Sequence, residues 1–174
     1  MFDNDYVLRG RHAEFADKLV SESTKGVAVF KRLVDLLYIA PIVGLLFDRD
    51  AVVESGTEKR IFAAVLNKES ESLLFAFRLV LLLDQKLGLD DQDRTRQAFS
   101  YSLSTEGLLS ARIESRVRGG IEVLHEHLCE GDARKRDLLD NLVQYLEVVD
   151  ITSPTSTVED LLAECRKVSR APSM

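Results

Sequence analysis

The chain has 174 residues, of which 45% are hydrophobic and 30% are charged, and it contains only 9 Gly and 3 Pro. This composition is typical of one soluble globular domain, and it excludes collagen-like, disordered and minimal disulfide-rich chains. The 29 Asp and Glu outnumber the 23 Lys and Arg, so the net charge is −6. That balance argues against broad nonspecific attachment to nucleic acid or to an anionic membrane, although a local basic patch stays compatible with it.

Several features predict a cytoplasmic protein. The first residues are acidic and are followed by Arg9 and Arg11 rather than by the apolar stretch of a secretory signal. The longest apolar runs, 36–47 and 73–83, are shorter than the roughly 20 residues that cross a bilayer. Two cysteines, Cys129 and Cys165, lack the spacing of a zinc site, and we expect them to be free thiols in a reducing compartment.

Apolar residues at helical spacing cover most of the first half of the chain. The series Leu8, His12, Phe15 and Leu19 places four side chains on one face of a first helix that ends near Val20. A second helix is expected to kink at its internal proline. Ser55 and Glu58 have the spacing of a capping box and predict the start of a third helix. We therefore expect helices at about 8–20, 28–47, 55–66 and 69–87.

The second half continues in the same way. Asp90 is expected to cap a fifth helix, and apolar residues at steps of three and four define a sixth from Leu109 to Leu128. A seventh follows Asp132, and a strand signal is found at most at 51–53. The sequence thus predicts an all-α fold, a single irregular bundle of about seven or eight helices, with a core domain at 1–150, a linker at 151–157 and a short helix and tail at 158–174.

Motifs for nucleophilic catalysis, nucleotide binding and metal binding are missing from the sequence. Glu122 and His125 have the Glu-x-x-His spacing of di-iron bundles, but such a site needs two of these pairs and the chain has one. We predict no metal site and no cofactor. The pair Gly119 and Gly120 lies inside a helical pattern, where it favours close helix packing over a ligand cradle.

Two charged residues interrupt apolar helices. Arg78 and Asp35 are each flanked by large apolar residues, so each is expected to be partly buried. A buried guanidinium needs a partner, and we expect Arg78 to pair with Asp35 or with Asp84. The alternative is a pocket for an anionic ligand.

A basic cluster occurs on the sixth predicted helix. Arg112 and Arg116 lie one turn apart, and Arg118 follows them. An edge of this kind suits phosphates or acidic side chains, so these three arginines are the candidates for binding an anion or a nucleic acid. Interspersed acidic residues leave an ordinary solvated helix face as the alternative.

One part of the chain resembles a known group of proteins. The stretch from Phe30 to Phe47, then Asp48-Arg49-Asp50, then Glu58 to Phe62 is similar to the helix, charged turn and helix of small bacterial proteins encoded beside DNA-phosphorothioation defence genes. The resemblance covers about a fifth of the chain. It implies an accessory subunit of a bacterial defence or DNA-maintenance complex, and it carries over no functional residue.

We therefore expect a non-enzymatic interaction or assembly subunit of a bacterial intracellular complex. It would bind a protein partner or form a homo-oligomer, would meet nucleic acid through a partner complex, and would not bind a membrane. One alternative is a DNA-binding regulator that uses 90–101 as its recognition helix. The other is a small helical enzyme that uses Glu122, His125 or the loop carboxylates Asp48, Asp50 and Glu54.

Overall fold

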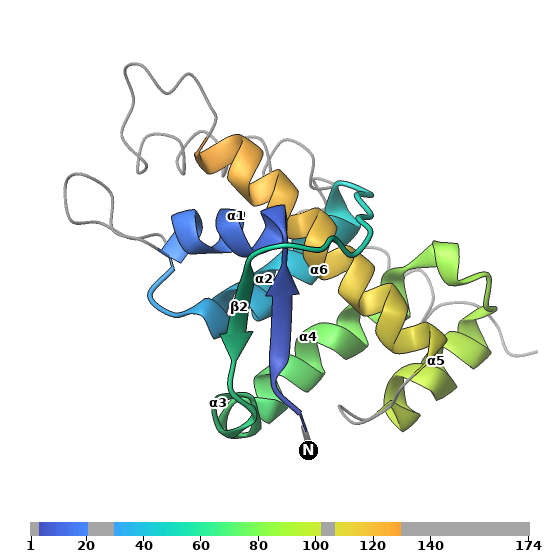
Figure 1. Cartoon of the computed structure of the whole chain (residues 1–174). Coiled ribbons are helices and arrows are strands. Elements are labelled where there is room, and N and C mark those ends of the chain that lie inside the picture. The colour runs from blue at the N-terminus through green and yellow to red at the C-terminus, as the bar shows by residue number, and fades with distance from the viewer. Residues whose placement is uncertain (1–3, 21–29, 102–106, 130–174) are drawn as a thin grey trace, which may run out of the picture. The chain divides into compact units, whose positions relative to one another are not determined.

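A computed structural model describes residues 4–20, 30–101 and 107–129, all of them within the unit Met1–Leu142. This part of the chain is mostly helical, as predicted, with a small antiparallel sheet (Figure 1). The elements are β1 (Tyr6–Arg9), α1 (Arg11–Val20), α2 (Leu33–Leu46), β2 (Glu58–Ile61), α3 (Ala63–Lys68), α4 (Ser70–Leu83), the short 3-10 helix η1 (Gln85–Leu87), α5 (Asp91–Ser100) and α6 (Leu108–Leu128).

Several predictions for the later part of the chain lie outside the described residues. They are the seventh helix after Asp132, the linker at 151–157 and the final helix at 158–174. The described ranges contain six α-helices, so the predicted total of seven or eight for the whole chain stays a prediction. In the described part of the chain, the helices are all too short or too polar to span a bilayer.

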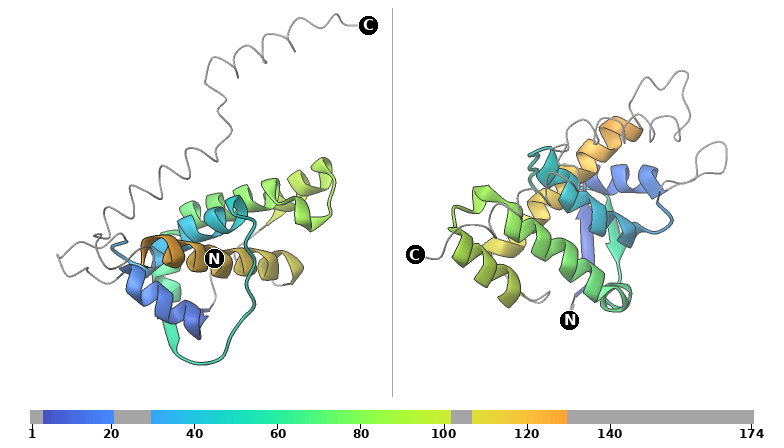
Figure 2. Two further views of the ribbon diagram at one scale, coloured as in Figure 1. Left: turned by 90° about the horizontal axis from the view of Figure 1, so that it is seen from above. Right: turned by 180° about the vertical axis from the view of Figure 1, so that it is seen from behind.

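Helix α6 is the central element of the fold. It has 21 residues and is about 32 Å long at 1.5 Å per residue, and it packs against α2 and α1. Helix α4 lies beside α2, and the two strands cover the opposite side of the molecule (Figures 1 and 2). The core between these elements is aliphatic, with Leu36, Leu37 and Ile121 completely buried.

Glycines allow α2 and α6 to pack with their backbones in contact. A Cβ atom added at Gly120 would overlap the carbonyl oxygen of Ala40, and one at Gly44 would overlap that of Arg116. Gly119 lies equally close to the carbonyl of Arg49. The prediction that the Gly119-Gly120 pair permits close packing is confirmed.

The sheet overturns two of the predicted helix starts. Strands β1 and β2 pair in the register Tyr6↔Ile61 to Arg9↔Glu58. Leu8 lies in β1, where it is buried, and therefore does not belong to the first helix. Glu58 begins β2, so the prediction that Ser55 and Glu58 form a helix capping box is wrong. The spacing of apolar residues within each segment is compatible with a helix. The backbone N–H and C=O groups instead form hydrogen bonds with a partner strand about 50 residues away in the sequence.

The other boundaries follow the sequence signals more closely. The sixth predicted helix is α6 almost to the residue, and Asp90 caps α5 by accepting a hydrogen bond from the Asp93 N–H at 2.8 Å. Helix α2 begins at Leu33, later than predicted, and runs continuously through Pro41. The segment 51–53 is irregular rather than a strand.

Candidate functional site

A buried ion pair joins α6 to the end of α4. Arg116 and Asp84 are each only 1% exposed. The Arg116 guanidinium donates two parallel hydrogen bonds, from Nε to Asp84 Oδ2 and from Nη2 to Asp84 Oδ1, both at 3.0 Å. Its Nη1 donates to the carbonyl oxygen of Gly44 at 3.1 Å, on α2. Two-point pairing of this kind fixes the guanidinium plane as well as its distance.

Further charges extend the pair into a network. Arg112 donates to Asp84 from Nε at 2.6 Å and approaches Asp50 through Nη1 at 2.9 Å. Lys86 lies 2.8 Å from Asp48, which also accepts a hydrogen bond from Arg116 at 3.0 Å. Three cations therefore face three carboxylates, and we call this set, Asp48, Asp50, Asp84, Lys86, Arg112 and Arg116, the α6 ion network.

The network holds its central carboxylate in the charged form. Burial alone raises the pKa of Asp84, but hydrogen bonds from Arg116, Arg112 and the Lys86 backbone N–H outweigh it, so the pKa lies well below its ordinary value. The pKa of Asp48 is also lowered, first by its hydrogen bond with Lys86 and then by that with Arg116. Both carboxylates stay ionised at neutral pH.

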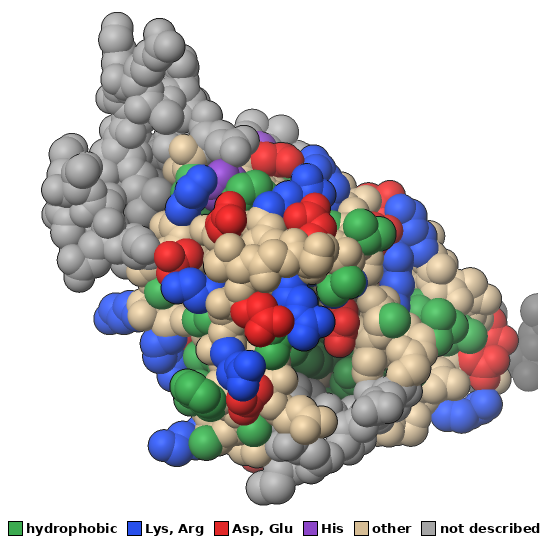
Figure 3. Space-filling view, viewed as in Figure 1, with side chains coloured by type: hydrophobic (Ala, Val, Ile, Leu, Met, Phe, Trp, Pro, Cys, Tyr) green, Lys and Arg blue, Asp and Glu red, His purple; other side chains and the backbone are tan. Residues whose placement is uncertain are grey.

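The three arginines predicted to bind anions all have protein partners. Arg118 donates to the carbonyl oxygen of Ala51 at 3.0 Å and reaches Glu114 at 3.4 Å, while Arg112 and Arg116 belong to the α6 ion network. The face of the molecule drawn in Figure 3 presents acidic and basic side chains side by side. Nucleic-acid binding by these arginines stays a prediction, and it would require them to release carboxylates or carbonyl oxygens that they already hold.

The predicted partners of Arg78 are occupied by other arginines. Asp35 accepts hydrogen bonds from Arg32, and Asp84 belongs to the α6 ion network. Arg78 instead lies over the ring of Phe99, with its guanidinium carbon 5.8 Å from the ring centre. Its Nε is buried and has no hydrogen-bond partner among the described residues. The sequence identified Asp84 as a buried ion-pair residue but did not identify the arginines that hold it.

A second polar group lies where α1 meets α6. His12 is completely buried, and its Nε2 is 3.0 Å from Oε1 of Glu122. The same oxygen is 2.8 Å from Nη2 of Arg11, and Arg49 approaches the other oxygen at 3.5 Å. The Glu122 carboxylate on α6 therefore contacts three basic side chains, those of His12, Arg11 and Arg49.

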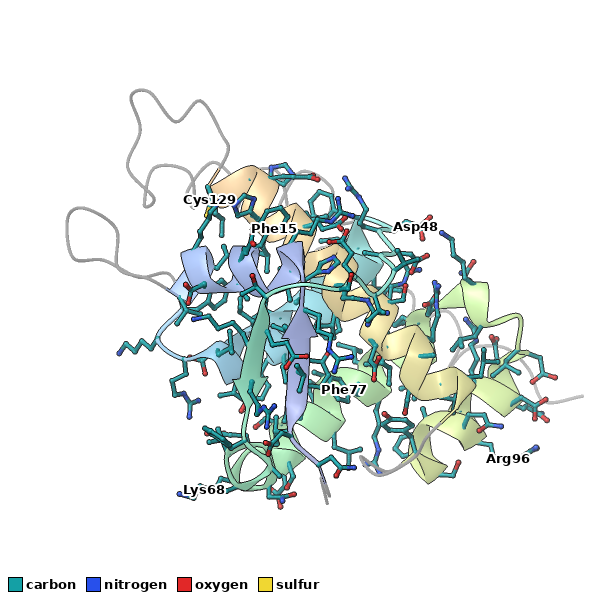
Figure 4. The ribbon with its side chains drawn as sticks, viewed as in Figure 1. Phe15, Asp48, Lys68, Phe77, Arg96 and Cys129 are labelled. Atoms are coloured by element: carbon teal, nitrogen blue, oxygen red, sulfur yellow. The ribbon has the colours of Figure 1, made fainter. Side chains whose placement is uncertain are left out.

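His125 also lies in this region, one turn further along α6. Its ring stacks on Phe15 of α1 at 3.8 Å between centroids, with 8° between the ring planes (Figure 4 labels Phe15). Lys18 Nζ lies 3.5 Å from His125 Nε2. The Glu122 and His125 pair singled out in the sequence is therefore divided between two different sets of neighbours.

This arrangement suits structure better than catalysis. An imidazole beside a carboxylate has the chemistry for proton transfer, but His12 is shielded from solvent and Glu122 is already bound by two arginines. Within the described ranges, no group of three His, Cys, Asp or Glu side chains is placed to hold a metal ion.

The other distinctive surface is apolar. Helix α2 carries Ile39, Ile42 and Leu46 on one stripe, and the neighbouring stripe of α4 carries Phe75, Leu79 and Leu83. We call these six residues the α2–α4 face. Phe75 is 69% exposed and Ile39 is 42% exposed. Figure 2, in its right-hand view, shows the two helices side by side on the side of the molecule away from the strands.

A shallow groove of about 440 Å³ runs along one end of this face. Its walls include Ile39, Ile42, Phe75 and Ala76, and Glu71 lies at its rim. At the same end, the Tyr38 hydroxyl donates to Glu69 at 2.8 Å, and burial together with this bond raises the pKa of Tyr38 to about 12. Tyr38 and Glu69 thus direct their polar atoms to each other, and the groove is lined mainly by hydrocarbon, with Glu71 and Ser72 as its further polar residues.

Comparison of the chain with family models, with curated proteins and with solved structures found no match. The site therefore has to be interpreted from its own geometry.

Some residues of these sites were missed by sequence reasoning. His12 appeared only as one member of an apolar helical series, and Phe75 only as part of a hydrophobic helix. A signal for the exposed face was present, because α2 has a single charged residue, Asp35, in 14 positions. A surface helix normally has a polar face. A helix without one is expected to be covered by other protein surfaces on every side.

Proposed function

We propose that this protein is a non-enzymatic interaction subunit and that it forms a symmetric dimer through the α2–α4 face. The observation that carries the proposal is the exposure of Phe75, 69%, at the edge of an apolar groove between two helices. Contiguous apolar surface of this kind costs free energy in water and marks interaction sites.

A second copy of the chain is the occupant that this face favours. The six side chains of the face are aliphatic or aromatic, with no charge among them. Such a surface is complementary to itself, as a two-fold axis requires, because each stripe can pack into the groove of its symmetry mate. Two pairs of helices would then form a four-helix core across the axis.

The charge distribution supports this choice over a nucleic-acid partner. The arginines of α6 are engaged by carboxylates or carbonyl oxygens, and on α5 Arg94 and Arg96 pair with Asp91 and Asp93. A recognition helix needs basic side chains that are not neutralised by their own helix. A DNA-binding regulator that uses α5 therefore has less support than an assembly subunit.

The wider setting is part of the proposal. The resemblance to accessory proteins of phosphorothioation defence fits a subunit of a bacterial defence or DNA-maintenance complex, in which other chains would contact DNA. A dimeric, non-catalytic subunit suits that role because it can present two copies of one surface to a larger assembly.

The test is the mass of the full chain in solution, measured by light scattering across a range of concentrations. We expect twice the chain mass of 19.6 kDa for the unmodified protein and a monomer for Phe75→Asp, because a carboxylate cannot be buried unpaired at the interface. Phe62→Asp is the matched control, since Phe62 is similarly exposed, at 62%, but lies outside the α2–α4 face. An unmodified chain that stays monomeric at every concentration, or a Phe75→Asp variant that stays dimeric, contradicts the proposal.

A further inference from the structure

Strand β1 has an outer edge that no other strand of the described residues covers. Among the described residues the sheet consists of β1 and β2, so β2 occupies one edge of β1 and no described strand pairs with the other. On that side, where Figure 1 shows β1 beside α6, residues of both elements line a hollow together with Val53. The hollow has a volume of about 220 Å³, and Tyr6, Glu114 and Arg118 line it together with the strand.

The pairing pattern shows which backbone groups face this hollow. Gly10 N–H donates to the carbonyl oxygen of Thr57 at 2.9 Å, which makes these two residues a hydrogen-bonded pair in the register of the sheet. Hydrogen-bonded and non-hydrogen-bonded pairs alternate along an antiparallel ladder. Tyr6 and Leu8 therefore bond to β2, and the N–H and C=O groups of Val7 and Arg9 point to the outer edge.

We propose that this edge binds an extended peptide segment of a partner protein, which adds to the sheet as a third, antiparallel strand. The main chain of the peptide would exchange N–H···O=C bonds with Val7 and Arg9. Antiparallel addition is favoured because short antiparallel pairs are slightly more stable than parallel ones. The site is separate from the α2–α4 face and does not depend on the dimer.

The side chains along β1 define what the added strand should carry. Asp5, Val7 and Arg9 lie on the face of the strand opposite to Tyr6 and the buried Leu8. Asp5 Oδ1 accepts a hydrogen bond from the Ala63 N–H at 2.9 Å, and its other oxygen lies 3.6 Å from Arg60. Directly opposite side chains interact, so we expect an acidic residue opposite Arg9, an apolar one opposite Val7 and a basic one opposite Asp5. From its N-terminus, an antiparallel ligand would therefore show the order acidic, apolar, basic at every second residue.

The intervening side chains of the ligand would point into the hollow. Its lining is mixed, with Val7, Leu8 and Val53 beside the polar side chains. The Tyr6 phenol lies close enough to Glu114 and Arg118 that burial and Glu114 raise its pKa while Arg118 opposes the increase. A small side chain with a hydroxyl group fits such a lining better than a large apolar one, because the polar part of the wall would otherwise lose hydrogen bonds to water. The chemistry of the site thus indicates a strand with Thr or Ser at these alternate positions.

The direct test uses two labelled peptides of equal composition and the full-length protein. The first has the order Thr-Glu-Thr-Val-Thr-Lys-Thr, and the second exchanges its Glu and Lys. We expect fluorescence anisotropy to show tighter binding of the first peptide, by about tenfold, from two matched cross-strand charge pairs instead of two mismatched ones. Absence of binding by both peptides at millimolar concentration overturns the proposal, as does equal affinity.

Backbone pairing is tested separately from charge. Methylation of the Val amide of the first peptide removes a donor that faces Val7, and we expect it to weaken binding about tenfold. Methylation of the Thr amide just before Val alters an N–H that points away from β1, and it should change the affinity by less than about twofold. Equal effects of the two methyl groups would contradict strand addition.

The protein side of the same contact gives a reciprocal test. Arg9 is exposed and pairs only with the similarly exposed Glu58 among the described residues, so Arg9→Glu should fold normally. We expect this variant to abolish the preference between the two peptides, because each of them then makes one matched and one mismatched charge pair, with residue 9 and with Asp5. Lys68→Glu makes the same charge change on α3 (Figure 4 labels Lys68) and should keep the original preference. Phe75→Asp should bind the first peptide as tightly as the unmodified chain, which separates this site from the dimer.

Discussion

At the scale of single residues, the strongest constraint on this molecule is the pairing of Asp84 with two arginines. A carboxylate that is 1% exposed would normally lose its charge, and it keeps the charge here because Arg112 and Arg116 both donate to it. The Lys86 backbone N–H supplies a further bond at 3.1 Å. Removing one partner of such a set leaves the others buried and unmatched.

We therefore expect Asp84→Asn to be strongly destabilising. The side chain keeps its shape but loses its charge, so the buried Arg116 guanidinium keeps only the more exposed carboxylates of Asp48 and Asp50 beside it. Breaking a buried ion pair by one partner costs about 3–5 kcal/mol. Chemical denaturation of the two proteins measures the difference, and Asp91→Asn, at a side chain 91% exposed, is the control that should change little. A loss of less than about 1 kcal/mol for Asp84→Asn would mean that the pair contributes little to folding.

The same residue should contribute to acid sensitivity. The pKa of Asp84 is lower in the folded chain than the value of about 3.9 in an unfolded one, so the unfolded state binds more protons between the two values. Its contribution is thus complete above about pH 5 and is lost as the pH falls through the unfolded and then the folded pKa. The free energy of unfolding of Asp84→Asn should accordingly fall less steeply below about pH 4 than that of the unmodified chain. Parallel acid profiles for the two proteins would show that Asp84 is not the titrating group.

At the scale of elements, the crossing of α2 and α6 decides how the fold packs. Replacing a helical glycine by alanine normally stabilises a helix by about 1 kcal/mol, because glycine loses more backbone entropy. At Gly120 the added methyl group would overlap the Ala40 carbonyl, which belongs to rigid helical backbone. We expect Gly120→Ala to lower the melting temperature, opposite in sign to its helix propensity, by an overpacking cost of about 1–3 kcal/mol.

Differential scanning calorimetry can measure this effect against a substitution without packing constraint. Gln97→Ala replaces an exposed residue on α5 with a better helix former, and it should leave the melting temperature unchanged or slightly raised. A raised melting temperature for Gly120→Ala would indicate that α2 and α6 do not approach as closely as this packing requires.

Sequence patterns predicted the elements whose signals are local. The regular apolar steps of α6 and the Asp90 cap of α5 depend on residues a few positions apart, and both were predicted with nearly correct bounds. The sheet was missed because β1 and β2 have four residues each and pair across 49 to 55 positions. A strand of four residues is too short to show alternation, so helical spacing at Leu8 and Ile61 was the stronger local signal.

The sites were predictable to a similar degree. Buried charge at Asp84 and close packing at Gly119 and Gly120 followed from polar or small residues in apolar helices. The partners of Asp84 could not be predicted in this way, because α4 and α6 must be placed relative to each other before Arg112 and Arg116 can be brought to one carboxylate. Arg78 shows the same limit, since its environment includes Phe99 from α5 and not the carboxylates expected from the sequence.

At the scale of the whole molecule, charge and apolar surface are separated. Carboxylates and arginines neutralise each other along α6, whereas α2 and α4 leave their apolar side chains exposed on the opposite side of the fold from the strands. Association through the α2–α4 face should therefore be driven by burial of hydrocarbon and depend little on salt. Binding to nucleic acid would instead weaken strongly as the salt concentration rises.

That contrast defines the last prediction, which concerns duplex DNA. Each phosphate neutralised by a basic side chain contributes about −0.9 to the slope of log affinity against log salt. Arg116 is buried in the α6 ion network and the net charge is −6, so we expect affinity for DNA alone to be no tighter than micromolar, with a shallow slope. Titration of a labelled duplex at two salt concentrations measures this. Arg118→Ala is the informative variant, since Arg118 holds the Ala51 carbonyl rather than a buried carboxylate and its loss should leave the fold intact. Nanomolar binding with a steep slope that Arg118→Ala reduces would show that these arginines exchange their protein partners for phosphates.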